Sequence, residues 1–287
     1  MALSFKVRLL NLFRNFFRIP PIEAALASLT TGKAPDSFIS KFVPNPYQYR
    51  KETFRIMERD GIKMKLDISD YVGHYVYFGF KESSMEDLFA LCMPGANVLD
   101  IGTNIGWTLQ NLAKRSGTGI VFGFEPDPYN YVRCNENVSL NNFENVTVFP
   151  IGLSDVNAQL TMEMRTPSNR GGNRIATTGT GYAVDVVRLD DFEPVTKLTR
   201  VDVIKIDVEG YELHVLKGAE VTLRKYLPAL FIEVDDNNLR DQGSSAEKLI
   251  RFLIDIGYSR ITGADNGVVV KITDSFSNCH FDIIALK

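Results

Sequence analysis

Seven short apolar runs, separated by helix-like segments, constrain the fold more than any other feature of the sequence. Amphipathic segments that predict helices lie between many of the runs, at residues 105–114, 129–140, 212–225 and 246–256. Strands that alternate with helices pair in parallel, so the pattern predicts an α/β fold: a doubly wound, mostly parallel seven-stranded sheet with helices on both faces. The runs are residues 97–101, 120–124, 146–149, 201–206, 229–234, 258–262 and 281–286.

The residues before this pattern divide into two regions. Residues 22–82 predict a small β-rich prefix, in which Asp60-Gly61 between two alternating stretches indicates a hairpin turn. From residue 83 to residue 287 we expect a single domain that carries the sheet. Residues 1–21 form the other region.

Residues 1–21 predict an amphipathic helix that stops at Pro20 and Pro21. Within residues 3–19 the apolar side chains share a broad face, and four basic residues occur without an acidic one. These charges interrupt the segment too often for it to span a bilayer. Two interpretations remain open: the helix lies peripherally on a membrane, or its apolar face packs on the domain or on a second subunit of a homo-oligomer.

The charge and the cysteines exclude several classes of protein. With 32 basic and 35 acidic residues, the formal charge is −3, which gives no overall attraction for a nucleic-acid backbone, and we expect no nucleic-acid partner. Cys92, Cys134 and Cys279 are widely spaced and form no CxxC pair, so they indicate neither a disulfide framework nor a thiolate zinc site. We expect a cytoplasmic protein, free or bound at the inner face of the membrane.

The segment VLDIGTNIG predicts a ligand-binding loop after the first strand. Glycine lets the backbone approach a ligand and adopt dihedral angles that other residues avoid. A dinucleotide site would show G-x-G-x-x-G here, whereas this chain has D-x-G-x-x-x-G. The loop therefore predicts a different cofactor, contacted by Asp100, Gly102, Thr103, Asn104 and Gly106.

Two carboxylates suit particular parts of a nucleoside-type cofactor. Glu125, which precedes Pro126 at the end of the second strand, can accept hydrogen bonds from both hydroxyls of a ribose. Asp100 can accept a hydrogen bond from a cationic amino-acid group or balance its charge. A dinucleotide fold also uses the first of these contacts, so Glu125 alone does not choose between cofactors.

Four separated blocks then occur in order: VLDIGTNIGWT, GFEPDPYNYVRCNENVSLNN, RLDD at residues 188–191, and VIKIDVEGYELHVLKGA. Together they resemble the FkbM family of S-adenosylmethionine-dependent methyltransferases, and the resemblance extends from about Tyr71 to residue 287. It implies a class I, Rossmann-like methyltransferase fold, S-adenosylmethionine as cofactor, and O-methylation of a small-molecule or saccharide acceptor such as a sugar, glycan or natural product. Thr103 stands where the family often has Ala.

The resemblance also assigns parts of the cofactor site. Gly102 and Gly106 would line the methionine part, Glu125 with Pro126 would hold the ribose, and residues 152–155 would border the adenine. For Asp155, a turn or a helix cap is the other interpretation.

Three side chains are candidates for the base that removes the proton of the acceptor hydroxyl. Asp207 and Glu209 follow the strand IKI at the carboxyl edge of the sheet, near the place where the methyl group must point. Asp207 has a second interpretation, in which it binds the ammonium of the cofactor. His214 is the third candidate, although a structural role within a helix suits it as well.

Acceptor contacts are expected from a polar segment at residues 165–181 and from two other positions. Arg170, Asn173 and Arg174 could hydrogen-bond a polyhydroxylated or anionic acceptor, with a surface loop as the alternative. His74 in the prefix and Glu233 at a strand end complete the predicted acceptor residues. Several carboxylates at strand ends make a divalent-metal site conceivable, but we expect none.

Two other functions share this fold. A methyltransferase acting on the ribose of RNA often uses a lysine-rich tetrad, but we expect Lys205 to point away from the site because it alternates with Ile206 and Asp207. A non-catalytic module docked through the first helix would have no need of both the glycines and Glu125. We therefore favour a small-molecule O-methyltransferase.

Overall fold

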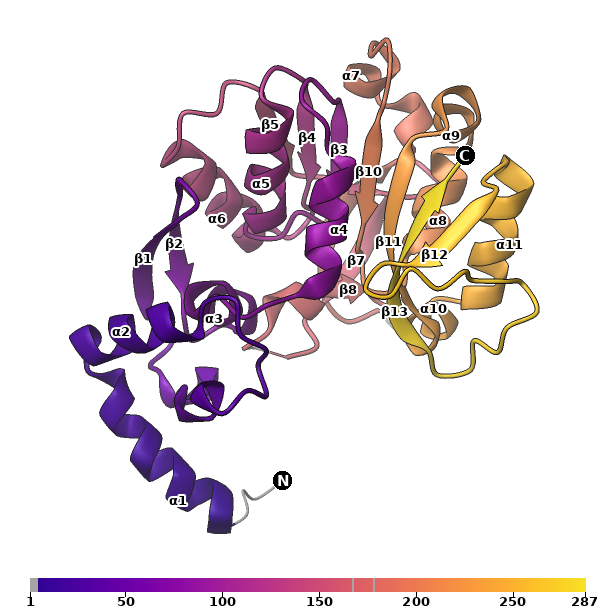
Figure 1. Ribbon diagram of the computed structural model, residues 1–287. Coiled ribbons are helices and arrows are strands. Elements are labelled where there is room, and N and C mark those ends of the chain that lie inside the picture. Colours follow the sequence, from indigo (N-terminus) through magenta and orange to yellow (C-terminus); the bar gives the residue numbers. More distant parts are fainter. Residues whose placement is uncertain (1–4, 167, 178) are drawn as a thin grey trace. The chain divides into compact units, whose positions relative to one another are not determined.

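The computed structural model describes residues 5–166, 168–177 and 179–287 and divides the chain into two compact units (Figure 1). The first unit contains the described residues up to Glu82 together with Thr166–Gly171, and the second contains Ser83–Arg165 and Gly172–Lys287. Each unit is described by itself below.

The second unit is built on a seven-stranded sheet with the order β12-β13-β11-β10-β3-β4-β5. Five neighbouring strands are parallel, and β13 (His280–Leu286) runs antiparallel to both β11 and β12. The mostly parallel, doubly wound sheet predicted from the sequence is therefore confirmed. The other strands are β3 (Val98–Ile101), β4 (Val121–Phe124), β5 (Val146–Phe149), β10 (Val203–Ile206), β11 (Ala229–Asp235) and β12 (Arg260–Gly263).

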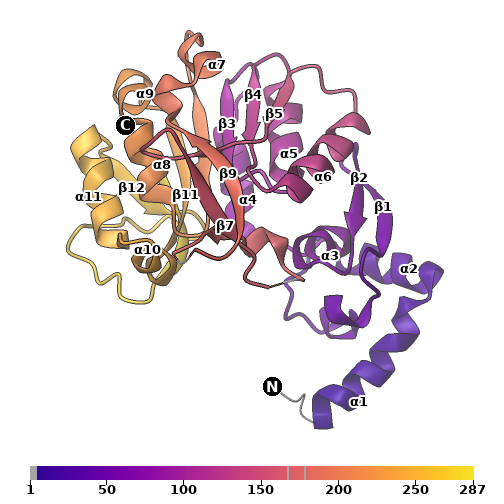
Figure 2. The same cartoon turned by 180° about the vertical axis from the view of Figure 1, so that it is seen from behind.

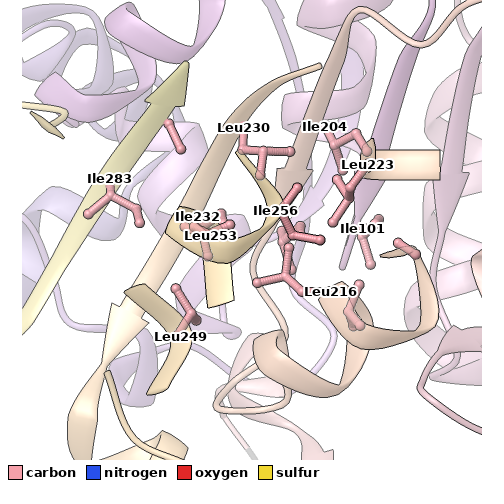
Figure 3. Close-up of a cluster of buried hydrophobic side chains, with 14 of the residues drawn as sticks. Ile101, Ile204, Leu216, Leu223, Leu230, Ile232, Leu249, Leu253, Ile256 and Ile283 are labelled. Atoms are coloured by element: carbon pink, nitrogen blue, oxygen red, sulfur yellow. The ribbon is translucent and has the colours of Figure 1, made fainter. Parts of the chain in front are cut away.

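Helices cover both faces of this sheet because the central strands are apolar on both sides. One face packs against α8 (Glu212–Gly218), α9 (Glu220–Tyr226) and α11 (Ala246–Ile256), where Ile204 and Ile232 meet Leu216 and Leu253 (Figure 3). The opposite face packs against α4 (Ser83–Leu91), α5 (Trp107–Ser116) and α6 (Pro128–Ser139). This arrangement buries the strands and leaves their carboxyl ends as the edge that holds the candidate site.

The seven strands lie within two residues of their predicted bounds, but other elements differ from the prediction. The helix expected at residues 212–225 is two helices, α8 and α9, separated at Ala219. A second, four-stranded sheet with the order β6-β9-β7-β8 was not predicted. Figure 2 labels two of its strands, β7 and β9. The strands of this sheet are β6 (Gly152–Leu153), β7 (Ala158–Glu163), β8 (Arg174–Ile175) and β9 (Tyr182–Val187), and the short elements η5 (Leu189–Asp191), α7 (Glu193–Thr196) and α10 (Asp236–Asp241) complete the unit.

The first unit combines helices with one hairpin. Strands β1 (Phe54–Arg59) and β2 (Ile62–Asp67) pair antiparallel, and both turn residues, Asp60 and Gly61, have positive φ, as a two-residue type I′ turn requires. The predicted hairpin is therefore confirmed. The other elements of the first unit are α1 (Phe5–Arg14), η1 (Asn15–Arg18), α2 (Pro20–Thr30), η2 (Ile39–Phe42), η3 (Pro46–Gln48) and α3 (Tyr71–Phe78). The short helix η4 (Arg170–Gly172) crosses the boundary between the units.

The two consecutive prolines, predicted to stop the first helix, also begin the next one. The first helical segment ends before them at Arg18, and Pro20 then occupies the first position of α2. Proline is well suited to this position because its fixed φ is helical and its missing N–H would have no partner there. Within the described residues, no helix is long and apolar enough to cross a bilayer.

Candidate functional site

The loop between β3 and α5 brings the ends of two neighbouring strands into direct contact. Gly102, Asn104 and Gly106 have φ of 77°, 51° and 87°, the left-handed region that favours glycine. A Cβ on Gly102 would overlap the carbonyl oxygen of Asp207, which follows β10. The sequence suggested that this glycine lets the backbone approach a ligand; the structure shows that it already lets β3 and β10 approach each other.

All five amides of the loop have acceptors within the protein. The N–H groups of Gly102 and Thr103 donate to the carbonyl of Phe124, and that of Gly106 donates to the carbonyl of Thr103. The Asn104 amide donates to Glu125 Oε2 at 2.8 Å, and the Ile105 amide donates to Asn104 Oδ1 at 2.7 Å. A pyrophosphate site depends on loop amides that are free to point at the ligand, so this loop is not built for a dinucleotide.

Glu125 joins the ends of β3 and β4. Its carboxylate is buried, and its two oxygens accept from the amides of Asn104 at 2.8 Å and Asp127 at 2.9 Å. Burial raises the pKa of Glu125 to about 8. The hydrogen bonds from the two amides act in the opposite direction and lower this pKa. In its ionised form each oxygen retains a lone pair, so the carboxylate can still accept from a pair of hydroxyl groups.

A buried ion network lies between the two strands. Lys205 is 3% exposed, and its Nζ donates to the carbonyl of Gly102 at 2.8 Å. The same Nζ lies 3.5 Å from Oδ1 of the fully buried Asp100 and 3.3 Å from Oδ2 of Asp207. Burial opposes the charge of Lys205, but the carboxylates of Asp207 and Asp100 raise the pKa of Lys205 above its ordinary value. Thr103 completes the network by donating its hydroxyl to Asp100 Oδ2 at 2.8 Å.

The expectation that Lys205 points away from the site is wrong. Residues i and i+2 of a strand share a face, so Lys205 lies on the same side as Asp207, and its register partner on β3 is Asp100. Ile206, which lies between Lys205 and Asp207, points to the opposite face and joins the hydrophobic core together with Ile204. Applied to the sequence, the same period-two rule would have placed Lys205 and Asp207 on one face, although not the contact of Lys205 with Asp100.

Glu209 lies in the turn that follows β10 and has the features of a proton acceptor. Its φ is 54°, and Asn238 Nδ2 donates to its Oε2 at 3.0 Å. Burial, and to a smaller extent the negative charge of Asp207, raises the pKa of Glu209 to about 7. A carboxylate with this pKa is a stronger base than an ordinary one and is still ionised to a large extent near neutrality.

The same turn is held by a carboxylate that the sequence analysis did not single out. Glu212 is buried, and its Oε1 accepts from the amides of Val208 at 3.1 Å and Gly210 at 3.0 Å. Burial raises the pKa of Glu212 to about 7. The turn that presents Asp207 and Glu209 is thus fixed by a side chain of the helix that follows it.

Negative charge gathers along this edge of the sheet. Glu233 on β11 lies opposite Asp282 on β13, and burial together with the charge of Asp207 raises the pKa of Glu233 well above its ordinary value. Burial also raises the pKa of Asp282. A cationic ligand at this edge would relieve the repulsion among these carboxylates.

Asp155 and His214 form a pair at the end of β6. His214 Nδ1 lies 3.1 Å from Asp155 Oδ1, its Nε2 lies 3.3 Å from the carbonyl oxygen of Gln242, and its ring stacks on Tyr211 at 4.3 Å. Burial opposes the charge of Asp155, but the bond to His214 holds the pKa of Asp155 below its ordinary value. Both nitrogens of His214 are therefore engaged by the protein, as in a structural histidine.

Glu125 and the segment around Gly152 lie close together. A Cβ on Gly152 would lie 3.6 Å from Pro126 Cβ and 3.1 Å from Val186 Cγ1. The residues expected to border the ribose and the adenine thus come together from β4 and β6.

Comparison with known proteins identifies the family. The profile described as Methyltransferase FkbM domain matches residues 100–260, more than half of the chain. The chain belongs to the FkbM family of methyltransferases. The resemblance noted in the four sequence blocks is thereby confirmed, and the domain is a class I methyltransferase domain whose cofactor is S-adenosylmethionine.

Characterised relatives of this FkbM-family chain match it over part of their lengths. The 2-O-methyltransferase NoeI of Sinorhizobium fredii is 28% identical over 51% of this chain and 66% of its own length. The hexuronic acid methyltransferase AglP of Haloferax volcanii is 31% identical over 42% of this chain and 48% of its own length. The chain therefore matches about half to two thirds of these relatives. The crystal structure of methyltransferase FkbM from Methylobacillus flagellatus KT superposes with a TM-score of 0.45 and 19% identity, covering 75% of this chain and 52% of that one.

The residues present fit S-adenosylmethionine. Among the described atoms, Oδ1 of Asp100 is buried without a hydrogen-bond donor, since the Lys205 ammonium stands 3.5 Å away. Glu125 has spare lone pairs for ribose hydroxyls, and the acidic edge suits a cofactor that carries a sulfonium and an ammonium. None of these features requires a phosphate.

The acceptor residues expected at residues 165–181 are engaged by the protein itself. Asn173 is buried and donates to Asp127 Oδ2 at 2.7 Å, and Tyr182 donates to the same carboxylate. Arg174 bridges Glu163 at 2.9 Å and Asp241 at 2.7 Å. These contacts anchor β8 within the second unit, a role that the polar composition of the segment did not reveal.

Two of the other predicted acceptor residues, His74 and Arg170, belong to the first unit, whereas Glu233 lies on β11 of the second. His74 is buried among aromatic rings of that unit, 4.7 Å from Phe78 between centroids, and its Nε2 lies 2.7 Å from the carbonyl oxygen of Pro44. Burial lowers the pKa of His74 to about 4, so this imidazole is neutral at pH 7. The Arg170 amide donates to Asp70 Oδ2 at 2.9 Å. Among the described residues, no three His, Cys, Asp or Glu side chains are grouped to hold a metal ion.

Proposed function

We propose that this chain transfers the methyl group of S-adenosylmethionine to a hydroxyl oxygen of a saccharide or a similar small polyhydroxylated molecule, with Glu209 as the base. The relatives named as a 2-O-methyltransferase and a hexuronic acid methyltransferase support this acceptor class. The single observation that carries the chemistry is the half-buried Glu209 carboxylate, with its pKa near 7, at the carboxyl end of β10.

The residues of the cofactor site divide the work of binding. Asp100 and the Gly102–Gly106 loop hold the amino-acid part, Glu125 accepts from the ribose hydroxyls, and Pro126 with residues 152–155 borders the adenine. The bound cofactor supplies an activated methyl group and a neutral leaving group. The protein has to align the acceptor oxygen with that methyl group, exclude water and accept one proton.

Glu209 suits the proton acceptance better than Asp207 does. Asp207 Oδ2 is engaged by the Lys205 ammonium at 3.3 Å, which makes Asp207 part of the network that joins β3 and β10. The Glu209 carboxylate instead receives the neutral amide of Asn238 at its Oε2. His214 is less suited than either, because both of its ring nitrogens have protein partners.

The test compares Glu209→Gln and Asp207→Asn with Glu193→Gln, a control that changes an exposed carboxylate on α7 in the same way. Each variant is titrated with S-adenosylmethionine by calorimetry, and its transfer of labelled methyl groups to uronic acids, neutral sugars and glycan fractions is measured. We expect Glu209→Gln to bind the cofactor normally and to lose about 10²–10⁴-fold in kcat.

The dependence on pH provides the second readout. Because Glu209 must be ionised to accept a proton, kcat of the unaltered protein rises with pH through about 7 and then levels off. Glu209→Gln removes this rise. An unchanged kcat and pH profile in Glu209→Gln would remove Glu209 from the proposal, and label found only in an RNA or protein fraction would overturn the acceptor class.

The alternative of RNA ribose methylation is not favoured by the position of Lys205. Although this lysine does lie at the site, its ammonium donates to the Gly102 carbonyl and lies 3.5 Å and 3.3 Å from the carboxylates of Asp100 and Asp207. The charge of this ammonium is therefore already balanced by carboxylates of the protein, which makes it less suited to orient a substrate hydroxyl. The alternative of a non-catalytic module is not favoured by the buried Glu125, whose ionised oxygens keep lone pairs for the hydroxyls of a cofactor ribose.

A further inference from the structure

The first helix of the chain carries two opposite stripes. Leu9, Leu12, Phe13 and Phe16 follow the spacing i, i+3, i+4 and i+7, so they share one face of α1 and its continuation η1. The polar residues at positions 11, 14, 15 and 18 repeat the same spacing on the opposite face. In a soluble domain the apolar stripe of such a helix normally faces the protein.

Here the polar stripe faces the protein. Asn11 Nδ2 donates to the Tyr47 hydroxyl at 3.0 Å, and Arg14 Nε donates to the carbonyl of Lys41 at 2.8 Å. Gln48 Nε2 donates to the carbonyl of Asn11 at 3.0 Å and to the side-chain oxygen of Asn15 at 3.2 Å. All these partners lie in residues 41–48 of the same unit, so side-chain hydrogen bonds fix the orientation of the helix.

The apolar stripe consequently faces outward. Leu9, Leu12, Phe13 and Phe16 are 60%, 69%, 66% and 58% exposed, whereas Asn11 and Arg14 are half-buried. Figures 1 and 2 both show α1 at the margin of the first unit, joined to it through α2. A contiguous row of large exposed apolar side chains indicates an interaction surface.

A second element extends this surface. Phe38, which precedes η2, is 77% exposed, and its ring lies 5.5 Å from that of Phe42. Phe42 lies 5.5 Å from Phe17, and Phe17 lies 5.7 Å from Phe16. The ring contacts therefore run from Phe38 to the stripe on the helix. We call the five exposed residues Leu9, Leu12, Phe13, Phe16 and Phe38 the apolar face.

The charge around the apolar face is strongly positive. Residues 1–51 contain eight lysines and arginines and two acidic residues, although the whole chain has a net charge of −3. One of the two acidic residues, Glu23, is buried and paired with Arg55 at 2.6 Å. Arg18, Lys33 and Lys41 are exposed. A face of leucine and phenylalanine among basic residues matches the anionic headgroups and acyl chains of a bilayer surface.

From these observations we propose that the apolar face docks the protein on an anionic membrane surface. The helix lies in the plane of the interface, its apolar side chains enter the boundary between headgroups and acyl chains, and the basic residues contact lipid phosphates. This inference goes beyond the proposed methyl transfer and does not depend on it. Of the two interpretations of the first helix that the sequence left open, it favours the peripheral membrane contact.

The test is cosedimentation of the full chain with lipid vesicles. One set of vesicles contains phosphatidylcholine alone, and the other contains phosphatidylcholine with about a third of phosphatidylglycerol. We expect binding to the anionic vesicles that weakens at high salt, and at least tenfold weaker binding to the neutral ones. The variant Leu12→Ser/Phe13→Ser/Phe16→Ser should bind the anionic vesicles at least tenfold more weakly than the unaltered chain.

A matched control separates this face from exposed apolar residues in general. Met93, Val221 and Val268 are 65%, 65% and 63% exposed in the second unit, and their triple replacement by Ser should leave vesicle binding unchanged. Absence of binding to anionic vesicles would overturn the proposal, as would an equal loss in the control variant. A third outcome against the proposal is an unaltered chain that forms a dimer by light scattering and does not bind vesicles, together with a Leu12/Phe13/Phe16 variant that is monomeric. A circular dichroism spectrum and a thermal unfolding transition like those of the unaltered chain show that either variant is folded.

Discussion

Replacing Lys205 by Met tests the ion network between β3 and β10. The substitution keeps the length and apolar stem of the side chain but removes the ammonium that contacts the Gly102 carbonyl, Asp100 and Asp207. Asp207 is 40% exposed and can be hydrated instead, so its loss is small. Asp100 is fully buried, burial raises the pKa of its carboxyl group, and the substitution removes the ammonium that opposes this effect most strongly.

The expected loss therefore comes mainly from Asp100. Removing one partner of a buried ion pair costs about 3–5 kcal/mol, a large part of the roughly 5–15 kcal/mol by which a domain is stable. The pKa of Lys205 is raised in the folded state, so its stabilising contribution is complete at any pH below its ordinary pKa and is lost only as the pH rises through the raised value. At pH 7 the full effect should be present.

Urea denaturation at pH 7 measures this difference in the free energy of unfolding. The control is Lys197→Met, which removes an exposed lysine from an i, i+4 pair with Glu193 and should cost less than about 1 kcal/mol. The double variant Lys205→Met/Asp100→Asn should recover most of the loss, because a neutral amide replaces the uncompensated carboxylate. A loss no larger than that of Lys197→Met, or no recovery in the double variant, would refute the reasoning.

Three further predictions concern single residues of the site. The pKa of Glu125 is near 8 in the folded state, so between about pH 4.5 and 8 the folded chain holds a proton that the unfolded chain has released. The free energy of unfolding should therefore fall as the pH rises through this range, and it should fall less in Glu125→Gln. Urea denaturation at several pH values measures this difference, and an equal fall in both proteins would contradict the prediction. Gly102→Ala should weaken S-adenosylmethionine binding at least tenfold by calorimetry, because its Cβ overlaps the Asp207 carbonyl at a φ of 77°; unaltered affinity would mean that the loop adjusts freely. His214→Ala should cost about 1 kcal/mol of stability through the lost contact with Asp155 and leave the pH profile of kcat unchanged, whereas a loss of the rise near pH 7 would make His214 the base.

The sequence predicted the central sheet well because its strands are short, continuous apolar runs. Such runs occur when both faces of a strand are covered by helices, and the alternating helical segments then determine that the strands are parallel. The second sheet escaped prediction for the opposite reason. Two of its strands have only two residues, and Ala158 and Gln159 of β7 are exposed, so neither an apolar run nor a clear alternation marks them.

The candidate site was predicted in part. The glycine loop and Glu125 stand next to strand ends in the sequence, and the structure brings them together through the Asn104 amide. The contact between Lys205 and Asp100 joins residues 105 positions apart, and only the register of β10 against β3 shows it. For His74 the limit is more general, because its partner is a backbone carbonyl 30 residues away that has no mark in the sequence.

The complete hydrogen bonding of the glycine loop has a consequence for the speed of turnover. A loop whose amides depended on a ligand would become ordered at each binding event and would lose that order at each release. Here the chain itself fixes residues 102–106, so binding incurs little loss of conformational entropy at the loop. The used cofactor can then leave and a fresh one enter without refolding of this part of the site, and the rate of exchange depends on contacts elsewhere.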